Sequence, residues 1–286
     1  MVDHRTERGE PSLAGHPVQR FSQKGAEAGE ARLPAEEPLA IEVNGQQVAV
    51  LLRTPGAEKA LALGYALSEG LISSPDDILL LHHCGSGLDD ELLPPAGDAA
   101  PYSARNRVQL TLTPQAAAAL RLDRPTRWVF SGCGSADIAN LAGELHVDGG
   151  NLRLSPEVLW AMVPALASVQ RAYQASGGIH AAALFDAAGQ LLAEAEDVGR
   201  HNAVDKAIGL AILRGRVPAA VLVATGRASS DIVAKAARVG IPVVASFSSS
   251  TSLGVRLAEA AGVTLIGYLR RNRFTAYTHP ERIAAP

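Results

Sequence analysis

Apolar and polar positions follow two different patterns on either side of residues 149–150, where two glycines interrupt the chain. Before them, short alternating segments are separated by turns, as in strands that bury one face. Asn44-Gly45 joins two such segments and is typical of the tight turn in a β-hairpin. The pattern predicts a hairpin over 39–54, a helix over 56–72, a strand over 107–114, a short helix and a strand over 126–130, with 78–93 ambiguous. We therefore expect a small α+β domain over residues 36–150.

Behind the two glycines, helices alternate with continuous apolar strands. Ser155 and Pro156 mark a helix start, with serine as cap and proline in the first turn. We expect this helix to reach about Ser176 and to kink near Pro164. A hairpin over 179–197 follows, and helices over 201–215, 229–240 and 251–262 then alternate with strands over 219–225, 241–247 and 263–269. Strands without polar positions are covered on both faces, so residues 151–286 are predicted to form a domain around a largely parallel sheet.

Composition narrows the class of protein. The chain has 286 residues, is 47% hydrophobic and carries a net charge of −3, so it can bury a substantial core. This charge gives no overall attraction to nucleic acid or membrane, and we expect the protein to bind neither. No apolar run reaches the roughly 18 residues that cross a bilayer, and the first ten residues lack a secretory signal. We expect a cytoplasmic protein whose polar residues 1–35 form a disordered leader.

Two cysteines, Cys84 and Cys133, are too few for a disulfide framework. Cys133 lies in the run SGCGS, directly after the apolar strand end WVF. Glycines on both sides leave its thiol little steric cover and let the backbone approach a partner. A free cysteine is most often a small buried apolar residue. This setting leaves the alternative equally open, a reactive loop thiol that accepts a group and passes it on.

Three polar segments follow the three apolar strands of the second half: 225–230, 248–251 and 270–273. Ligands of open α/β sheets bind outside the carboxyl ends of parallel strands, so these loops are expected to meet at one edge. Helix N-termini attract anions, and arginine forks suit phosphate. Each loop alone is explained by helix caps or a solvated surface, but their convergence favours a site for a phosphate-bearing ligand. The candidate binding residues in these loops are Arg227, Ser229, Ser249, Arg270, Arg271, Asn272 and Arg273.

Residues 196–206, EDVGRHNAVDK, form the densest polar run in the apolar second half. His201 and Asp205 are four residues apart and would share one helix face. This spacing allows a metal site, but one helical pair is a weak signal. The alternative is a polar network that holds the loop to the helix, and we expect no bound metal.

These segments together resemble the FdhD/NarQ family of sulfur carrier proteins that active formate dehydrogenase requires. The resemblance rests on EEPLAIEVNG, ALGYALSEGLI, the Cys133 loop, GGIHAAALFD, EDVGRHNAVDK, TGRASSDIVAKAARVGIPVVASFSSSTSL and TLIGYLRRNRFTAYTHPERI. It implies a cytidine-deaminase-like, three-layer α/β domain after a smaller α+β domain, and a homodimer. It also implies that the protein binds the molybdenum bis(molybdopterin guanine dinucleotide) cofactor as a substrate, with GDP as a mimic. Sulfur would come as a persulfide from a cysteine desulfurase and would be passed to the molybdenum centre before the cofactor enters formate dehydrogenase.

The resemblance also assigns residues. Cys133 matches the first cysteine of the family's Cys-x-x-Cys loop, which carries the persulfide and makes the protein a sulfurtransferase. The segment from Tyr268 through Leu269 to Arg273 matches the segment that the family uses for the cofactor. Ala136 stands where the family has its second loop cysteine, so no relay between two loop thiols is available. One thiol is sufficient for persulfide transfer, and we interpret Cys84 as structural.

Two rival functions are considered. A zinc deaminase needs H-x-E and a later P-C-x-x-C. Here His180 begins HAA, so Ala182 stands in place of the glutamate, and no later cysteine pair exists, so no zinc is expected. A chaperone that binds the molybdenum cofactor without moving sulfur is the serious alternative, because the second loop cysteine is missing.

Overall fold

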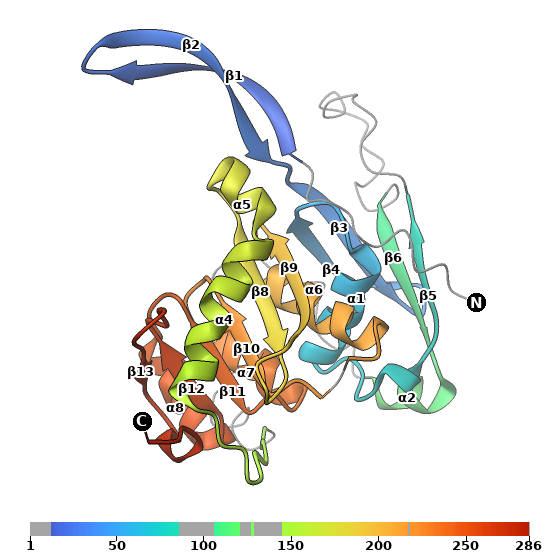
Figure 1. The fold of residues 1–286 in the computed structure, drawn as a ribbon. Coiled ribbons are helices and arrows are strands. Elements are labelled where there is room, and N and C mark those ends of the chain that lie inside the picture. The colour runs from blue at the N-terminus through green and yellow to red at the C-terminus, as the bar shows by residue number, and fades with distance from the viewer. Residues whose placement is uncertain (1–12, 86–105, 121–126, 129–144, 217, 286) are drawn as a thin grey trace.

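The computed structural model describes residues 13–85, 106–120, 127–128, 145–216 and 218–285. These residues form three sheets, and two of them are the centres of an N-terminal and a C-terminal domain packed side by side (Figure 1). The third is a two-stranded ribbon that projects from the body of the molecule (Figure 1). Within the described part, no helix is long and apolar enough to cross a membrane.

The N-terminal domain has a five-stranded sheet in the order β5-β6-β3-β4-β7. Its strands are β3 (Glu37–Val43), β4 (Gln46–Arg53), β5 (Ile78–Cys84), β6 (Arg107–Leu112) and β7 (Arg127–Trp128). The predicted hairpin is confirmed, because β3 and β4 pair antiparallel around Asn44 and Gly45 with φ angles of 49° and 80°. The ambiguous stretch contributes the edge strand β5, and the short helix α2 (Pro114–Ala119) follows β6.

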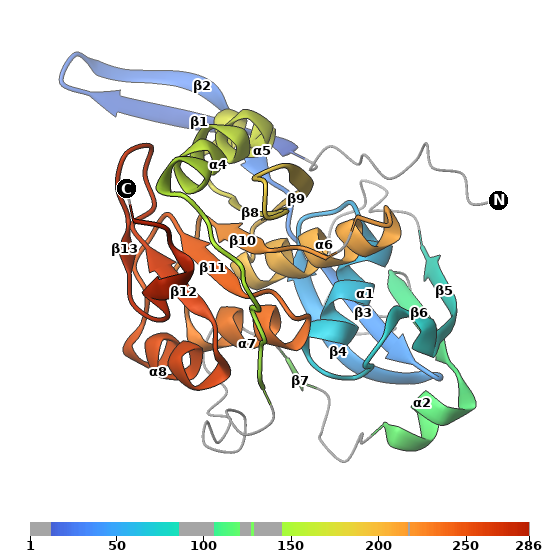
Figure 2. The ribbon, with the colours of Figure 1, turned by 60° about the horizontal axis from the view of Figure 1, so that its bottom comes forward.

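Helix α1 (Glu58–Ser68) joins the two domains (Figure 2). Residues 60–68 are all buried, because α1 packs on the five-stranded sheet on one side and on α6 (Arg200–Leu213) on the other. The two helices come close enough for their backbones to touch. A Cβ atom at Gly64 would overlap the carbonyl oxygen of Asp205, and one at Gly209 would overlap that of Ala60. Glycine is therefore required on both helices at this crossing.

The C-terminal domain has a six-stranded sheet in the order β13-β12-β11-β10-β8-β9. Its strands are β8 (His180–Phe185), β9 (Leu191–Asp197), β10 (Val221–Ala224), β11 (Val243–Ser246), β12 (Thr264–Gly267) and β13 (Thr275–Ala276). Strands β10, β11 and β12 are parallel, as predicted. The hairpin β8–β9 and the short β13 add antiparallel pairs, so the sheet is mixed rather than largely parallel.

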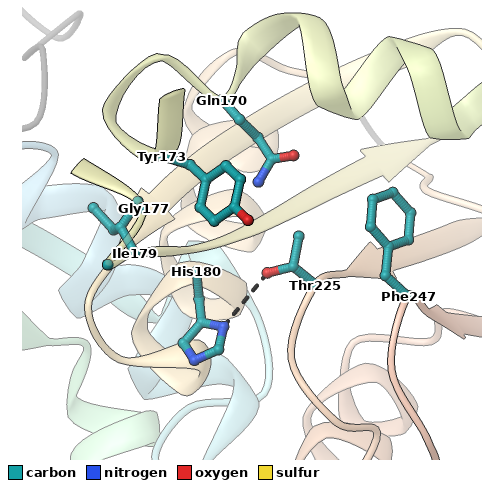
Figure 3. A pocket seen from close by; sticks show the side chains of 8 residues that line it. Gln170, Tyr173, Gly177, Ile179, His180, Thr225 and Phe247 are labelled. Carbon is teal, nitrogen blue, oxygen red and sulfur yellow. Dashed lines mark hydrogen bonds between the residues drawn. The ribbon is translucent and has the colours of Figure 1, made fainter. Parts of the chain in front are cut away.

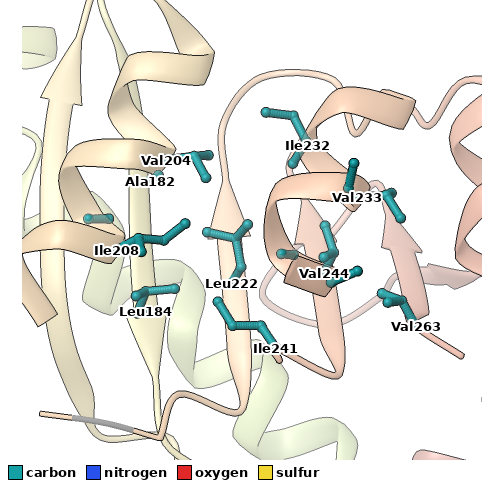
Figure 4. Close-up of a cluster of buried hydrophobic side chains, with 14 of the residues drawn as sticks. Ala182, Leu184, Val204, Ile208, Leu222, Ile232, Val233, Ile241, Val244 and Val263 are labelled. Atoms are coloured by element: carbon teal, nitrogen blue, oxygen red, sulfur yellow. The ribbon is translucent and has the colours of Figure 1, made fainter. Parts of the chain in front are cut away.

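Helices cover both faces of this sheet, which gives the expected three layers. On one face, α6, α7 (Ser230–Arg238) and α8 (Ser252–Ala261) pack on the sheet. Val204 of α6 and Ile232 of α7 lie in one cluster with Leu222 and Val244 of the strands (Figure 4). On the other face, α4 (Pro156–Val169) covers alternate residues of the same strands. Since successive residues of a strand point to opposite faces, both sets must be apolar. This explains the continuous apolar runs in the sequence.

The expected disorder of residues 1–35 is wrong for residues 13–34. Strands β1 (Leu13–Ser22) and β2 (Gly25–Pro34) form an antiparallel hairpin that pairs residue by residue from its tight turn to its base. The hairpin is mostly exposed, and its base lies against α5 (Arg171–Ser176). Backbone pairing across a short turn organises this segment, and a prediction based only on buried apolar area does not count that contribution.

Two boundaries also differ from those expected. The predicted helix over 155–176 divides into α4 and α5 at Gln170, whose ψ of 64° is not helical, whereas Pro164 lies inside α4. Leu145 and Val147 pack in the core between α7, α8 and the six-stranded sheet. The C-terminal domain therefore begins before the expected boundary at residue 150.

Candidate functional site

Three loops meet at the carboxyl ends of β10, β11 and β12, as the sequence predicts. We call residues 225–230, 247–251 and 268–273 together the loop edge. Backbone hydrogen bonds join its segments, from Ala228 N–H to Ser249 O at 3.1 Å and from Tyr268 N–H to Ser248 O at 2.9 Å. The three loops therefore form one continuous surface.

The last segment of the loop edge has a constrained backbone. Tyr268 has a φ angle of 53°, in the left-handed region that residues with a side chain rarely adopt. Such outliers occur at ligand sites, where the surrounding structure holds them. The Tyr268 ring is exposed, and Arg270 N–H donates to Arg273 O at 2.8 Å, which closes a tight turn. A small cavity of about 260 Å³ lies at this segment and is lined by Tyr268, Arg270, Arg273, Phe274 and Thr275.

The candidate residues of this segment differ in what they can bind. Arg271, Asn272 and Arg273 are exposed, as is Arg227 in the first loop. Arg270 donates to the carbonyl oxygens of Phe247 and Leu269, at 2.6 and 2.8 Å, so part of its guanidinium holds the loop. The side chain of Leu269 is fully buried in the core under α4. The contact between Leu269 and the cofactor that the resemblance implies is therefore left to its backbone.

Two helices begin at the loop edge and differ in their caps. At α8, the Thr251 hydroxyl accepts a hydrogen bond from Gly254 N–H at 3.0 Å. At α7, the cap residue Ser229 accepts no such bond, and its hydroxyl oxygen is buried without a partner among the described residues. Buried polar groups usually have partners, so the start of α7 can accommodate an additional polar group.

A cavity of about 620 Å³ adjoins the loop edge (Figure 3). Thr225 and Phe247 belong to both, and the wall opposite is formed by the α4–α5 junction and the start of β8. Tyr173 and Phe247 stand on opposite sides, with Gln170 above and His180 below (Figure 3). Gln170 is only 7% exposed, and its amide forms no hydrogen bond with a described residue. An amide that faces a cavity in this way offers both a donor and an acceptor to a ligand.

His180 is the ionisable group of the cavity. Burial lowers its pKa, and the nearby charges of Arg200 and His201 lower it further, against the opposing effect of Asp197. The imidazole is therefore neutral near pH 7, with Nδ1 3.5 Å from the Thr225 hydroxyl. A neutral imidazole has one donor and one acceptor nitrogen. The floor of the cavity is thus polar and uncharged.

The residues around this cavity were missed in the sequence. Gln170, Tyr173 and His180 are distant from the predicted loops along the chain and meet them only through the antiparallel pairing of β8 with β10. A signal was nevertheless present, because Thr225 begins the first predicted loop segment and Phe247 directly precedes the second. The Gly177-Gly178 pair, which lines the cavity, was interpreted only as a helix end.

The polar run 196–206 does not form the metal pair that its spacing allows. Asp205 is 1% exposed, and its carboxylate accepts hydrogen bonds from Lys235 Nζ at 2.8 and 3.0 Å and from the Ser68 hydroxyl at 2.6 Å. His201 lies 3.7 Å from Asp231 instead. Among the described residues, no group of three metal-ligating side chains gathers. The alternative interpretation, a polar network, is the one that forms.

Cys133 and Ala136 lie outside the described residues. The described chain before them ends with β7, which pairs parallel with β4 through Ala49 and Val50. The described chain resumes at Leu145, in the core of the C-terminal domain. Cys84 is half-buried on β5, with its thiol 3.5 Å from the Gln109 amide oxygen.

Comparisons with known proteins agree over nearly the whole chain. The sequence model of the FdhD/NarQ family matches residues 34–284. The sulfur carrier protein FdhD of Mycobacterium tuberculosis is 39% identical over 258 residues, which cover 88% of this chain and 91% of that protein. The protein of the same name from Anaeromyxobacter dehalogenans is 37% identical over 278 residues, 94% of each chain.

The fold also has a counterpart among solved structures. A proposed formate dehydrogenase accessory protein from Desulfotalea psychrophila has a crystal structure that superposes with a TM-score of 0.72. The match covers 96% of this chain and all of the other, at 24% sequence identity. At this identity the likeness establishes the fold.

Proposed function

Because this chain belongs to the FdhD/NarQ family, we propose that it is a sulfur carrier that serves the maturation of formate dehydrogenase. In this proposal, it takes sulfane sulfur from a cysteine desulfurase in the cytoplasm. It passes the sulfur to the molybdenum bis(molybdopterin guanine dinucleotide) cofactor, which it binds as a homodimer. Two relatives that cover about nine-tenths of the chain are named sulfur carriers, which supports the transfer role.

The chemistry assigned to Cys133 consists of two sulfur transfers. The Cys133 thiolate attacks the outer sulfur of the donor persulfide, the donor's S–S bond breaks, and the donor cysteine leaves as a thiolate. Cys133 then holds the persulfide, with no net oxidation or reduction. In the second transfer, the S–S bond at Cys133 breaks and Cys133 leaves as a thiolate. The molybdenum centre of the substrate supplies the electron pair that reduces sulfane sulfur to sulfide.

The observation that carries the binding proposal is that an arginine-rich loop edge adjoins a cavity with a polar, uncharged floor. Phosphate groups of the guanine dinucleotide would lie on Arg227, Arg271 and Arg273 and at the start of α7, where anions are favoured. The guanine base would enter the 620 Å³ cavity beside Phe247. Guanine has donor and acceptor groups on one edge, and the free Gln170 amide could pair with both. This match between ligand and side chains supports the guanine nucleotide as the ligand class.

The direct test is mass spectrometry of the protein after incubation with a cysteine desulfurase and free cysteine, with persulfides trapped by alkylation. We expect an extra sulfur on the peptide with Cys133 and none on the peptide with Cys84. A Cys133→Ala variant should stay folded, bind GDP normally and fail to support formate dehydrogenase activity in cells. Cys84→Ser is the matched control, because it removes the only other thiol.

The alternative function is a chaperone that binds the cofactor without moving sulfur. The replacement of the family's second loop cysteine by Ala136 favours it. If the Cys133→Ala variant supports full formate dehydrogenase activity, the chaperone function replaces sulfur transfer. The proposed guanine nucleotide site would be common to both functions.

A further inference from the structure

Thr54 lies in the loop after β4 and is completely buried. Three of its polar groups are hydrogen-bonded to the segment 197–206 of the other domain. Its N–H donates to Asp197 Oδ2 at 3.1 Å, its hydroxyl accepts from Val198 N–H at 3.1 Å, and its carbonyl accepts from Lys206 Nζ at 2.6 Å. One residue of the N-terminal domain is thus held by three bonds to the C-terminal domain.

A buried ion pair supports these bonds. Lys206 Nζ lies 2.7 Å from Asp197 Oδ2, and both side chains are at most 3% exposed. Asp197 Oδ1 accepts from Gly199 N–H and from the Asn202 amide, at 2.8 and 3.0 Å. Asn202 also donates to the carbonyl oxygen of Leu52 on β4 at 2.7 Å. We call Thr54, Asp197, Asn202 and Lys206 the Thr54 cluster.

On the N-terminal side, the Thr54 cluster fixes the end of β4. Strand β4 pairs with β7, from which the chain continues to the segment that contains Cys133. The position of β4 therefore sets the point from which the Cys133 segment leaves the described sheet.

On the C-terminal side, the cluster lies directly behind the candidate site. Asp197 ends β9 and pairs across the sheet with His180, at the floor of the cavity. Arg200 begins α6 two residues after Val198, and its side chain lies against Gly226 at the loop edge. The cluster thus touches β4, which is the neighbour of the strand that leads toward Cys133, and it includes residues of β9 and α6, which adjoin the binding site.

We propose that the Thr54 cluster positions the N-terminal domain, and with it the start of the Cys133 segment, relative to the loop edge and cavity. Its members are positioning residues, because none of them lines the cavity or belongs to the loop edge. The consequence for sulfur transfer rests on the proposed function, whereas the fixed arrangement of the two domains does not. This assigns a role to the sequence EDVGRHNAVDK that is separate from binding and metal ligation.

The arrangement of the domains can be measured directly by electron–electron distance spectroscopy. One nitroxide label is attached to Gln46→Cys in β4 and the other to Glu259→Cys in α8. Both positions are exposed, and the distance between the two labels reports how the two domains are arranged. Both are introduced with Cys84→Ser and Cys133→Ser, so that no native thiol is labelled. The test variant is Asp197→Asn with Lys206→Met, which removes both buried charges, keeps the volume, and turns a donor toward Thr54 N–H. We expect a narrow distance distribution in the parent protein and a broadened or shifted one in this variant.

The matched control is Glu194→Gln with Arg214→Met. This pair joins β9 to the residue that caps the end of α6, at 3.8 Å, but it is partly exposed and does not reach Thr54. The control should keep the parent distribution. Should the Asp197/Lys206 variant fail to fold, Thr54→Val removes a single hydroxyl and Thr54→Ser retains it. Thr54→Val should broaden the distribution and Thr54→Ser should restore it, and an unchanged distribution in a folded Thr54→Val protein would overturn the proposal.

Function is measured separately on proteins that retain Cys133. In the Thr54→Val variant, persulfide loading from the desulfurase and GDP affinity should stay within two-fold of the parent, and formate dehydrogenase activation should fall at least ten-fold. A purely structural role would reduce loading, binding and activation together. If the parent itself loads no persulfide, the proposed function fails, and the distance distributions still decide the positioning role.

Discussion

The loop edge and the Thr54 cluster are both built from polar and charged side chains, but the first is available to a ligand and the second holds the structure together. In the Thr54 cluster, Asp197 and Lys206 are almost completely buried and are bonded to each other and to Thr54. At the loop edge, Arg227, Arg271 and Arg273 are exposed, and none of their guanidinium groups bonds to a described residue. Satisfied buried charges hold a structure in place, whereas exposed and unsatisfied ones remain available to a ligand.

The contrast between buried structural charges and exposed binding charges predicts its largest effect at a second buried ion pair, Lys235 with Asp205. Lys235 on α7 is bonded to Asp205 on α6 and to Ser68 and Glu69 around the end of α1, all within 3.0 Å. Burial opposes the charge of Lys235, but Asp205 and Glu69 outweigh it and raise the pKa of the lysine. Burial already raises the pKa of Asp205, and Lys235→Met removes the buried cation that opposes this effect. We expect the variant to cost about 3–5 kcal/mol of unfolding free energy, measured by urea denaturation.

A double variant gives the control for this prediction. Lys235→Met with Asp205→Leu removes both charges and should recover most of the lost stability. GDP affinity of the folded single variant should be unchanged, because Lys235 does not line the cavity. A large loss of GDP affinity with little loss of stability would place Lys235 with the binding residues. It would contradict the distinction between buried structural charges and exposed binding charges.

The converse prediction concerns the loop edge. Arg271→Ala with Arg273→Ala should weaken GDP binding by tens of times or more, since each charge-assisted contact contributes roughly 1.5–3 kcal/mol. Calorimetric titration with GDP measures the affinity. Unfolding free energy should change by less than about 0.5 kcal/mol, because both side chains are exposed. Lysine at both positions should recover only part of the affinity, because the bidentate fork is lost. Equal GDP affinity in the alanine variant would show that the arginines only face solvent.

His180 lies between the two regions and gives a smaller, pH-dependent effect. Its pKa is lowered in the folded protein, so the unfolded chain binds more protons below its ordinary pKa of about 6.5. Its contribution to stability is therefore complete above that pH and is lost as pH falls toward the folded pKa. Unfolding free energy measured from pH 5 to 8 should fall on the acid side less steeply in His180→Gln than in the parent. Identical pH profiles would indicate that His180 is not shielded from water.

The smallest effect is expected at the other thiol. Cys84 is half-buried and makes one long contact with Gln109. Cys84→Ser preserves the size and a donor, so formate dehydrogenase activation should stay within two-fold of the parent. Loss of activation with normal folding would give Cys84 a part in sulfur movement and weaken the assignment to Cys133 alone.

The sequence predicts those parts of the molecule that depend on local patterns. Asn44-Gly45 specifies its hairpin because the two residues adopt the positive φ angles that such turns require. The three parallel strands follow from their apolar runs, and the convergence of their loops follows from the topology of such sheets. The exposed arginines could be named as candidates for the same reason.

The parts that were missed depend on distant pairings. Thr54 and Lys206 are 152 residues apart, and no local pattern indicates that a lysine in an amphipathic run is buried. Gln170 faces the cavity because the helix breaks there rather than at Pro164, six residues earlier. Leu269 differs from its neighbours in the predicted binding segment, because its side chain is buried in the core whereas Tyr268 and Arg270 are exposed.

The crossing of α1 and α6 at Gly64 and Gly209 has a consequence for how the protein unfolds. With no side chain between them, the two backbones cannot separate by a small amount without losing contact along both helices. The two domains have separate sheets, but we expect them to unfold cooperatively because their contact is lost all at once. Heating should melt them in a single calorimetric transition, with equal van't Hoff and calorimetric enthalpies. Either half expressed alone would expose the apolar face of one helix and should aggregate rather than fold.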